Sequence, residues 1–157
     1  MSGESVPLID KVVLYVVDRG RLLVFLQPKH PGILLQVPGG TVEAGEALEV
    51  AVRRELAEET GLTDVAQVTR LGSRSYSFDF RGIRQIHQRH FFHVELESSQ
   101  HLRERWSYME LSSSLGFGPI ELSLFWLEFD VAARDLGYEY GALLPELRAT
   151  MESGNER

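Results

Sequence analysis

The sequence predicts a single domain of mixed α/β class. Continuous β-branched and apolar runs near the N-terminus indicate strands, and a run of good helix formers follows them. The 157 residues suffice for one core, and 43% hydrophobic with 25% charged residues is typical of a soluble globular protein. No repeat or linker divides the chain, so we expect one domain over residues 1–157, with 153–157 as a frayed tail.

The N-terminal part is expected to begin with a β-hairpin. Lys11–Val17 and Leu22–Leu26 are apolar runs, and the Asp-Arg-Gly sequence between them is a turn signal. A third short strand is expected at Ile33–Val37. It is ended by Pro38 and two glycines, which predict a loop.

A helix is expected at Ala47–Thr60, because Gly61 is a natural residue to end it and apolar Leu62 follows. After it, strand patterns alternate with turn signals, and the chain ends in an amphipathic segment. The expected elements are strands at Val65–Leu71, Ser73–Phe80, Gln85–Glu97 and Pro119–Asp130, a surface loop at Gln100–Leu115, and a C-terminal helix at Leu143–Met151.

Three carboxylates cluster at the end of the central helix. At about 100° per residue, with Glu55 at 0°, Glu58 falls at about 300° and Glu59 at about 40°. They therefore share one arc, and this arc continues an apolar stripe that should face the protein body. The stripe consists of Leu48, Ala51 and Val52.

A charge cluster on a helix is usually a solvated face, but these acids are expected to be partly enclosed. Like charges, the negative end of the helix dipole and desolvation would all raise their energy. Arg53 and Arg54 cannot both point into the arc, so protein charge alone is not expected to balance it. Oxygen ligands suit Mg²⁺ or Mn²⁺, and a divalent cation would supply the balance.

The glycine-rich loop before the helix supports this reading. Gly39, Gly40 and Gly45 give a backbone that can approach a ligand closely, although such a loop alone is more often a turn than a site. Its value lies in its fixed spacing to the acids.

The stretch from Gly40 to Leu62 resembles the signature of the Nudix hydrolases. That signature is Gly, five residues, Glu, seven residues, then Arg-Glu-aliphatic-any-Glu-Glu-any-Gly-aliphatic. No required position departs from it. The matching residues are Gly40, Glu46, Arg54, Glu55, Leu56, Glu58, Glu59, Gly61 and Leu62.

The resemblance implies the Nudix fold, a mixed β-sheet sandwiched between α-helices. It also implies divalent-metal-dependent hydrolysis of the pyrophosphate bond of a nucleoside diphosphate linked to another moiety, with Mg²⁺ or Mn²⁺ as cofactor. By motif position, the metal ligands are Glu55, Glu58 and Glu59, joined by the Gly39 carbonyl, and the groups that orient them are Arg54 and Glu46.

The chemistry also needs a carboxylate that takes a proton from the attacking water. Glu55 is one candidate. Because many Nudix enzymes use an acid from a later loop or strand, Glu95, Glu110 and Glu121 are others. We favour Glu121, which follows the Gly116–Pro119 loop, although an ordinary surface glutamate is the commoner role for each.

Substrate choice lies outside the signature. Aromatic and basic side chains could stack a base or hold a phosphate, and Gly40 could let the backbone approach the substrate. Phe78, Phe92 and Phe125 are better explained as core by strand alternation. The candidate binding residues are Tyr76, Arg84, Arg89 and Trp106, with Phe78, Arg81 and His87 as further options.

A nucleoside triphosphate or a nucleotide-sugar-like compound is the expected substrate. The proline of ADP-ribose-cleaving relatives is missing near Ser77 and Phe78. The main alternative is a non-catalytic nucleotide-sensing or regulatory module, in which the signature is often eroded. A more remote one is an isoprenoid diphosphate isomerase, whose relatives use a cysteine, and this chain contains none.

The formal net charge of −7 argues against stable nucleic-acid binding by bulk electrostatics. No signal peptide or membrane-length apolar run is apparent, so a cytoplasmic protein without membrane association is expected. The partner is then a small nucleotide-type diphosphate, with a homodimer as a further possibility.

Overall fold

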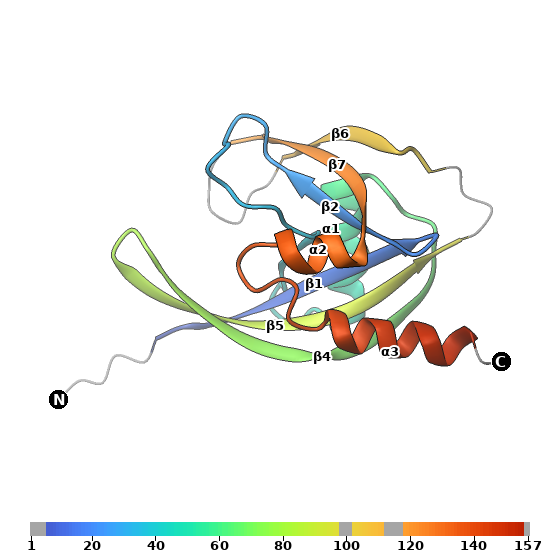
Figure 1. Cartoon of the computed structure of the whole chain (residues 1–157). Helices are drawn as coiled ribbons and strands as arrows, with labels where there is room; N and C mark the ends of the chain where they lie inside the picture. Colours follow the sequence, from blue (N-terminus) through green and yellow to red (C-terminus); the bar gives the residue numbers. More distant parts are fainter. Residues whose placement is uncertain (1–5, 98–101, 112–117, 156–157) are drawn as a thin grey trace.

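The computed structural model describes residues 6–97, 102–111 and 118–155, which form one mixed β-sheet and three helices (Figure 1). The strand order is β4-β5-β1-β2-β7-β6, and β3 pairs with β1 beside this path. The strands are β1 (Leu8–Asp18), β2 (Arg21–Leu26), β3 (Gly39–Thr41), β4 (Val65–Phe80), β5 (Ile83–Leu96), β6 (Arg105–Glu110) and β7 (Ile120–Glu128), and the helices are α1 (Leu48–Thr60), α2 (Phe129–Asp135) and α3 (Leu144–Asn155).

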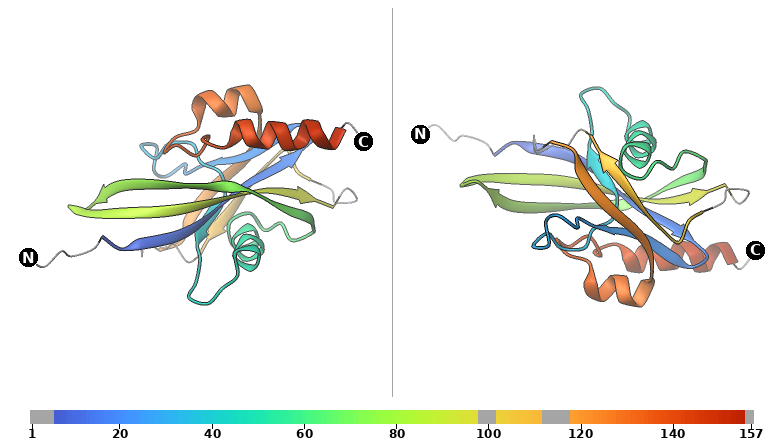
Figure 2. Two further views of the ribbon diagram at one scale, coloured as in Figure 1. Left: turned by 90° about the horizontal axis from the view of Figure 1, so that it is seen from below. Right: turned by 90° about the horizontal axis from the view of Figure 1, so that it is seen from above.

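The sheet has helices on both faces, as the resemblance to the Nudix hydrolases implied. Figure 2 shows α1 on one side of the sheet and α2 with α3 on the other. The alternation of β1 explains the two cores, because successive side chains of a strand point to opposite faces. Val12, Leu14 and Val16 pack with α1, whereas Val13 and Tyr15 pack with α2 and α3.

The sheet divides next to β3. β1 pairs with β2 only near their shared turn, at Val17↔Leu22 and Asp18↔Arg21. Farther from the turn, β1 pairs with β3 instead, and Val12 lies opposite Gly40. The glycine segment is therefore a short strand below α1, rather than a free loop.

One strand prediction and one loop prediction need correction. Ile33–Val37 is not a strand, since this segment contributes only an isolated bridge between Gln36 and Phe25. The surface loop expected at Gln100–Leu115 is also wrong where the structure describes it, because residues 105–110 form β6. Trp106 and Tyr108 alternate inward there and pack against the α1-side core, and this burial decides for a strand. Residues 100–101 and 112–115 lie outside the described part.

Other boundaries also moved. The two strands expected between residues 65 and 80 form one strand, β4, with a bulge between Arg70 and Gly72. The prediction for Pro119–Asp130 holds through Glu128, but α2 then follows. The C-terminal helix, expected to end at Met151, continues to Asn155, and 156–157 are not described. The frayed tail stays a prediction. No helix within the described ranges is both long and apolar enough to cross a bilayer.

Tyr15 joins the sheet to the segment before α3. Its side chain is fully buried, its hydroxyl donates to the Tyr140 carbonyl at 2.5 Å, and it accepts from the Leu143 amide at 3.2 Å. Tyr15→Phe leaves both backbone groups without this partner, so we expect the free energy of unfolding to fall by about 1–3 kcal/mol, measured by urea denaturation. Tyr138→Phe, which removes an exposed hydrogen bond to the Leu34 amide, should cost less. Equal losses would contradict this role for Tyr15.

Candidate functional site

α1 places the acidic residues where the sheet divides. Of the predicted stripe, Ala51 and Val52 are fully buried and Leu48 is half-buried against the same core. The same face carries Glu55 and Glu59, each only 6% exposed. Glu58 lies at the edge, with 41% of its side chain exposed.

The helix ends at Gly61 for two reasons. Its φ is +79°, a left-handed conformation that favours glycine. A Cβ there would also lie 2.8 Å from the Tyr108 ring of β6. Trp106, on the same strand, donates to the Thr60 carbonyl at 2.9 Å and packs against the core. These contacts hold β6 against the end of α1, so Trp106 has a packing role here.

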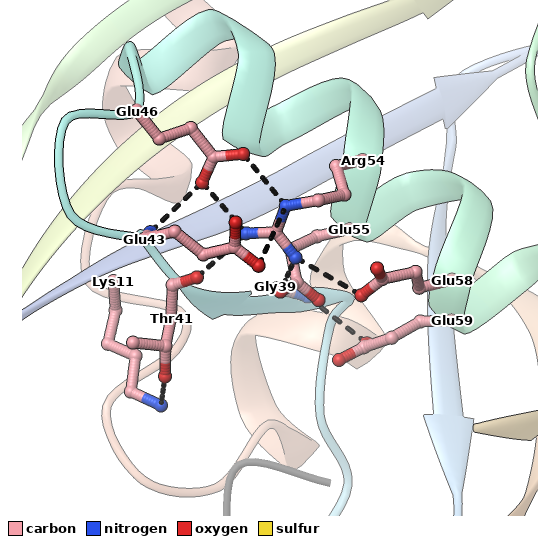
Figure 3. A network of polar contacts seen from close by, with 9 residues as sticks. All are labelled: Lys11, Gly39, Thr41, Glu43, Glu46, Arg54, Glu55, Glu58 and Glu59. Atoms are coloured by element: carbon pink, nitrogen blue, oxygen red, sulfur yellow. Dashed lines mark hydrogen bonds and ion pairs between the residues drawn. The ribbon is translucent and has the colours of Figure 1, made fainter. Parts of the chain in front are cut away.

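Arg54 is the centre of a polar network in front of β3 (Figure 3). Its guanidinium bonds both oxygens of Glu46, at 2.8 and 2.9 Å, and donates to the Thr41 carbonyl at 2.9 Å. A third nitrogen bonds Glu55 at 2.8 Å and Glu58 at 3.1 Å. The bidentate contact between Arg54 and Glu46 lowers the pKa of Glu46 to about 2.

The two glycines of β3 lie directly under the other carboxylates. The Gly39 amide donates to Glu59 at 3.2 Å. A Cβ at Gly40 would lie 2.1 Å from the carboxyl carbon of Glu55, so only glycine leaves room for this side chain. The fixed spacing of Gly40 to the helix in the sequence thus has a steric reason.

Gly40→Ala should therefore displace Glu55. We expect a loss of about 1–3 kcal/mol in the free energy of unfolding, as for other overpacked sites, together with weaker divalent-cation binding. Denaturant unfolding and a cation titration measure the two effects. Gly32→Ala is the matched control, because a Cβ there meets nothing within 4 Å. An unperturbed Gly40→Ala protein would contradict the steric argument.

The buried carboxylates are poorly compensated. Burial raises the pKa of Glu55 to about 7, against the lowering effect of Arg54. Burial and the nearby charges of Glu110 and Glu55 also raise the pKa of Glu59. The pKa of Glu110 is raised by burial and by Glu58. Lys11 lies close enough for Glu55 and Glu59 to raise its pKa, although burial lowers it overall.

Glu110, not the favoured Glu121, is brought to this site. On β6, Glu110 continues the alternation of Trp106 and Tyr108 toward α1. Glu121 follows the opposite alternation on β7, in phase with Phe125, which packs with the α2 and α3 core. Glu110 pairs with Ile120 and Glu121 pairs with Met109, so the two acids are one position out of register and point to opposite faces of the sheet. The sequence could have identified Glu110 had β6 been recognised.

The remaining binding candidates lie elsewhere. Arg89 is only 3% exposed; its guanidinium lies 3.9 Å from the Tyr76 ring and 4.0 Å from the Tyr140 ring. It also donates to the Tyr138 carbonyl. Arg89 therefore fixes the segment before α3 instead of presenting its guanidinium to a phosphate. Arg84 is exposed near the far end of the β4–β5 hairpin and lies 3.3 Å from the Ser77 hydroxyl.

The donor set fits a divalent cation. Five carboxylates (Glu46, Glu55, Glu58, Glu59 and Glu110) surround two cationic side chains, Arg54 and Lys11. Their oxygens are the hard ligands that Mg²⁺ and Mn²⁺ prefer. Within the described ranges, no three acidic or histidine side chains are already gathered in metal-binding geometry. Arg54 bridges Glu55 and Glu58, so a cation would compete with its guanidinium.

A sequence model described as NUDIX domain matches residues 8–115 of the chain. The NAD-capped RNA hydrolase NudC of Mycobacterium tuberculosis is 42% identical over 77 residues, which cover 48% of this chain and 24% of that protein. The chain thus spans about a quarter of that relative's length. The RNA pyrophosphohydrolase of Caulobacter vibrioides is 35% identical over 125 residues, covering 66% of this chain and 71% of the relative.

Solved structures share the architecture. A NUDIX hydrolase from Nitrosomonas europaea superposes with a TM-score of 0.64 at 19% identity, covering 90% of this chain and 89% of the other. At that identity the likeness concerns the fold alone.

Proposed function

Because the chain belongs to the Nudix hydrolase family, we propose that it is a divalent-cation-dependent enzyme that hydrolyses the pyrophosphate bond of a nucleoside diphosphate linked to another moiety. The observation that carries the proposal is the group of buried carboxylates gathered around Gly39 and Gly40 with too few cationic side chains beside them. The family relationship supports a hydrolase, and this site supplies the groups that such chemistry requires.

Glu55, Glu58 and Glu59 would hold the cation. When bound, Mg²⁺ or Mn²⁺ neutralises phosphate oxygens and lowers the pKa of bound water. Glu46 and Arg54 orient the carboxylates through the network of Figure 3, and Lys11, which interacts with Glu55 and Glu59, would contact a phosphate of the substrate. Glu110, whose pKa is raised, is the group proposed to take the proton of the attacking water.

The substrate panel follows from the chemistry and from the relatives. Nucleoside triphosphates and nucleotide sugars carry the required linkage, and the names of the two relatives add NAD-capped RNA and RNA 5′-pyrophosphate ends. The cytoplasmic location, the homodimer and the single domain over residues 1–157 stay predictions.

The decisive test incubates the purified chain with this panel in Mg²⁺, in Mn²⁺ and in EDTA, and identifies the products by mass. We expect hydrolysis with either cation, none in EDTA, and a loss of at least about 100-fold in Glu58→Gln. Glu49→Gln is the matched control, an exposed acid on the first turn of the same helix. Tight binding of a nucleotide without turnover in any metal would instead identify a sensing module.

A further inference from the structure

The outer part of the β4–β5 hairpin extends beyond both helical layers (Figure 2). One face of it carries an aromatic strip, which we define as Tyr76, Phe78 and Phe80 of β4 with His87 of β5. Tyr76 lies opposite His87 in the strand register. The ring centroids of Tyr76 and Phe78 are 5.8 Å apart, and those of Phe78 and His87 are 4.7 Å apart.

The aromatic strip is not part of either core. Phe78, expected in the core from alternation, is only half-buried, as are Tyr76 and Phe80. Ile83, opposite Phe80, is 64% exposed. These rings lie beyond the helices and outside both cores, so packing of the cores does not explain them. A contiguous apolar patch on a protein surface marks an interaction site.

The hairpin has the opposite charge to the rest of the protein. Residues 65–96 carry five arginines against two acids, Asp79 and Glu95, a net charge of +3 in a chain of −7. The arginines are Arg70, Arg74, Arg81, Arg84 and Arg89. The whole-chain charge therefore says little about this segment. Two copies of the hairpin would repel each other, whereas a polyanion would be attracted.

Lys11 links the aromatic strip to the carboxylates electrostatically. Lys11 of β1 lies opposite Arg89 in the parallel pairing of β1 and β5, and Arg89 contacts the Tyr76 ring. Lys11 interacts electrostatically with residues on both sides. It contributes to lowering the pKa of His87, and the charges of Glu55 and Glu59 act to raise the pKa of Lys11 itself. A ligand with phosphates beside Lys11 would thus have its next groups over Tyr76 and Phe78.

We propose that the aromatic strip stacks the bases of a single-stranded oligonucleotide whose 5′ phosphate end lies at the carboxylates. This rests on the proposed function, because the carboxylate site fixes the phosphate end. Aromatic rings stack on every base, and the exposed arginines Arg74, in phase with Tyr76 on β4, and Arg81, beside the Phe80 ring, contact the phosphates between them. The substrate class is then a nucleic acid 5′ end rather than a mononucleotide.

The test measures binding without turnover. The probe is a 3′-fluorescein-labelled uridine hexaribonucleotide with a 5′-monophosphate, which contains no pyrophosphate bond, and its anisotropy is followed in Mg²⁺. We expect UMP to compete at least about tenfold more weakly than unlabelled hexamer. Phe78→Ala and Phe80→Ala should each weaken hexamer binding by about 5- to 100-fold, and Phe78→Trp should restore it.

Leu26→Ala, an exposed apolar residue on β2, is the matched control and should leave binding unchanged. Thermal unfolding checks that each variant is folded. If Phe78→Ala does not fold, Phe80→Ala, near the hairpin tip, tests the proposal in its place. Hexamer binding no tighter than UMP binding would overturn the proposal. So would strip variants that convert a dimer into a monomer in sedimentation yet bind the hexamer normally.

The two proposals fail separately. Hydrolysis of small-molecule substrates without hexamer binding overturns only the proposal that the aromatic strip binds an oligonucleotide. Hexamer binding without hydrolysis of any substrate overturns only the enzymatic assignment.

Discussion

Glu110→Gln should lower kcat/KM by about 10²- to 10⁴-fold, the usual contribution of a general base. Glu110 lies on the face of β6 that meets α1, and burial and the nearby charge of Glu58 raise its pKa. The amide keeps the shape of the side chain but cannot accept the proton of water. The pH profile of kcat/KM is the measurement, and its acidic limb should disappear in the variant.

Glu121→Gln is the matched control for this experiment. Glu121 is a neighbouring acid, on the strand paired with β6, but it points to the other face of the sheet. We expect its activity within about threefold of the wild-type value, since this side chain lies away from the site and surface changes of that kind have small effects. A large loss in Glu121→Gln with normal activity in Glu110→Gln would reverse the assignment.

Glu55→Gln should stabilise the protein at pH 8 in EDTA while it inactivates the site. The pKa of Glu55 is about 7 in the folded protein, against 4.5 for an unperturbed glutamate. Between these two pH values the folded state therefore binds more protons than the unfolded state. The free energy of unfolding therefore falls as pH rises through this window. The penalty is fully present above pH 7, on the order of 2–3 kcal/mol, and is absent well below pH 4.5.

The difference in unfolding free energy between wild type and Glu55→Gln is the quantity to measure, at pH 5 and at pH 8. His87, whose pKa is lowered to about 4, makes stability rise with pH in both proteins and cancels in the difference. Glu46, with a pKa of about 2, loses its contribution only below pH 4.5.

Added Mg²⁺ completes the comparison. The cation binds the ionised carboxylates, so it should raise the melting temperature of the wild type more at pH 8 than at pH 5. Glu55→Gln should gain much less. A variant that is less stable than the wild type at pH 8 in EDTA would show that Arg54 already compensates Glu55, and would contradict the charge argument.

Much of the site was readable from local sequence. The positions of Glu55, Glu58 and Glu59 follow from helical periodicity, and their enclosure follows from the apolar stripe they continue. Arg54 and Glu46 came from the signature, and the structure brings them together. These residues share one loop and one helix, so their geometry depends on short-range rules that a sequence retains.

Residues outside this segment were placed less well. Arg89 has the composition of a phosphate contact, but tertiary packing encloses it between Tyr76 and Tyr140, which is 51 positions farther along the chain. Trp106 similarly became part of the contact between β6 and α1. Such roles depend on which strands become neighbours, and a side chain's own sequence context does not encode its neighbours.

The sequence by itself determined the mixed α/β class, the helix with its carboxylates and the glycine spacing, because these follow from periodicity and steric rules within about 25 residues. Only the tertiary structure decided that β6 exists, that Glu110 instead of Glu121 faces the site, and that aromatic rings line one face of the β4–β5 hairpin. The physical reason is that strand pairing joins residues far apart in the chain, and a shift of one residue turns a side chain to the other face of the sheet.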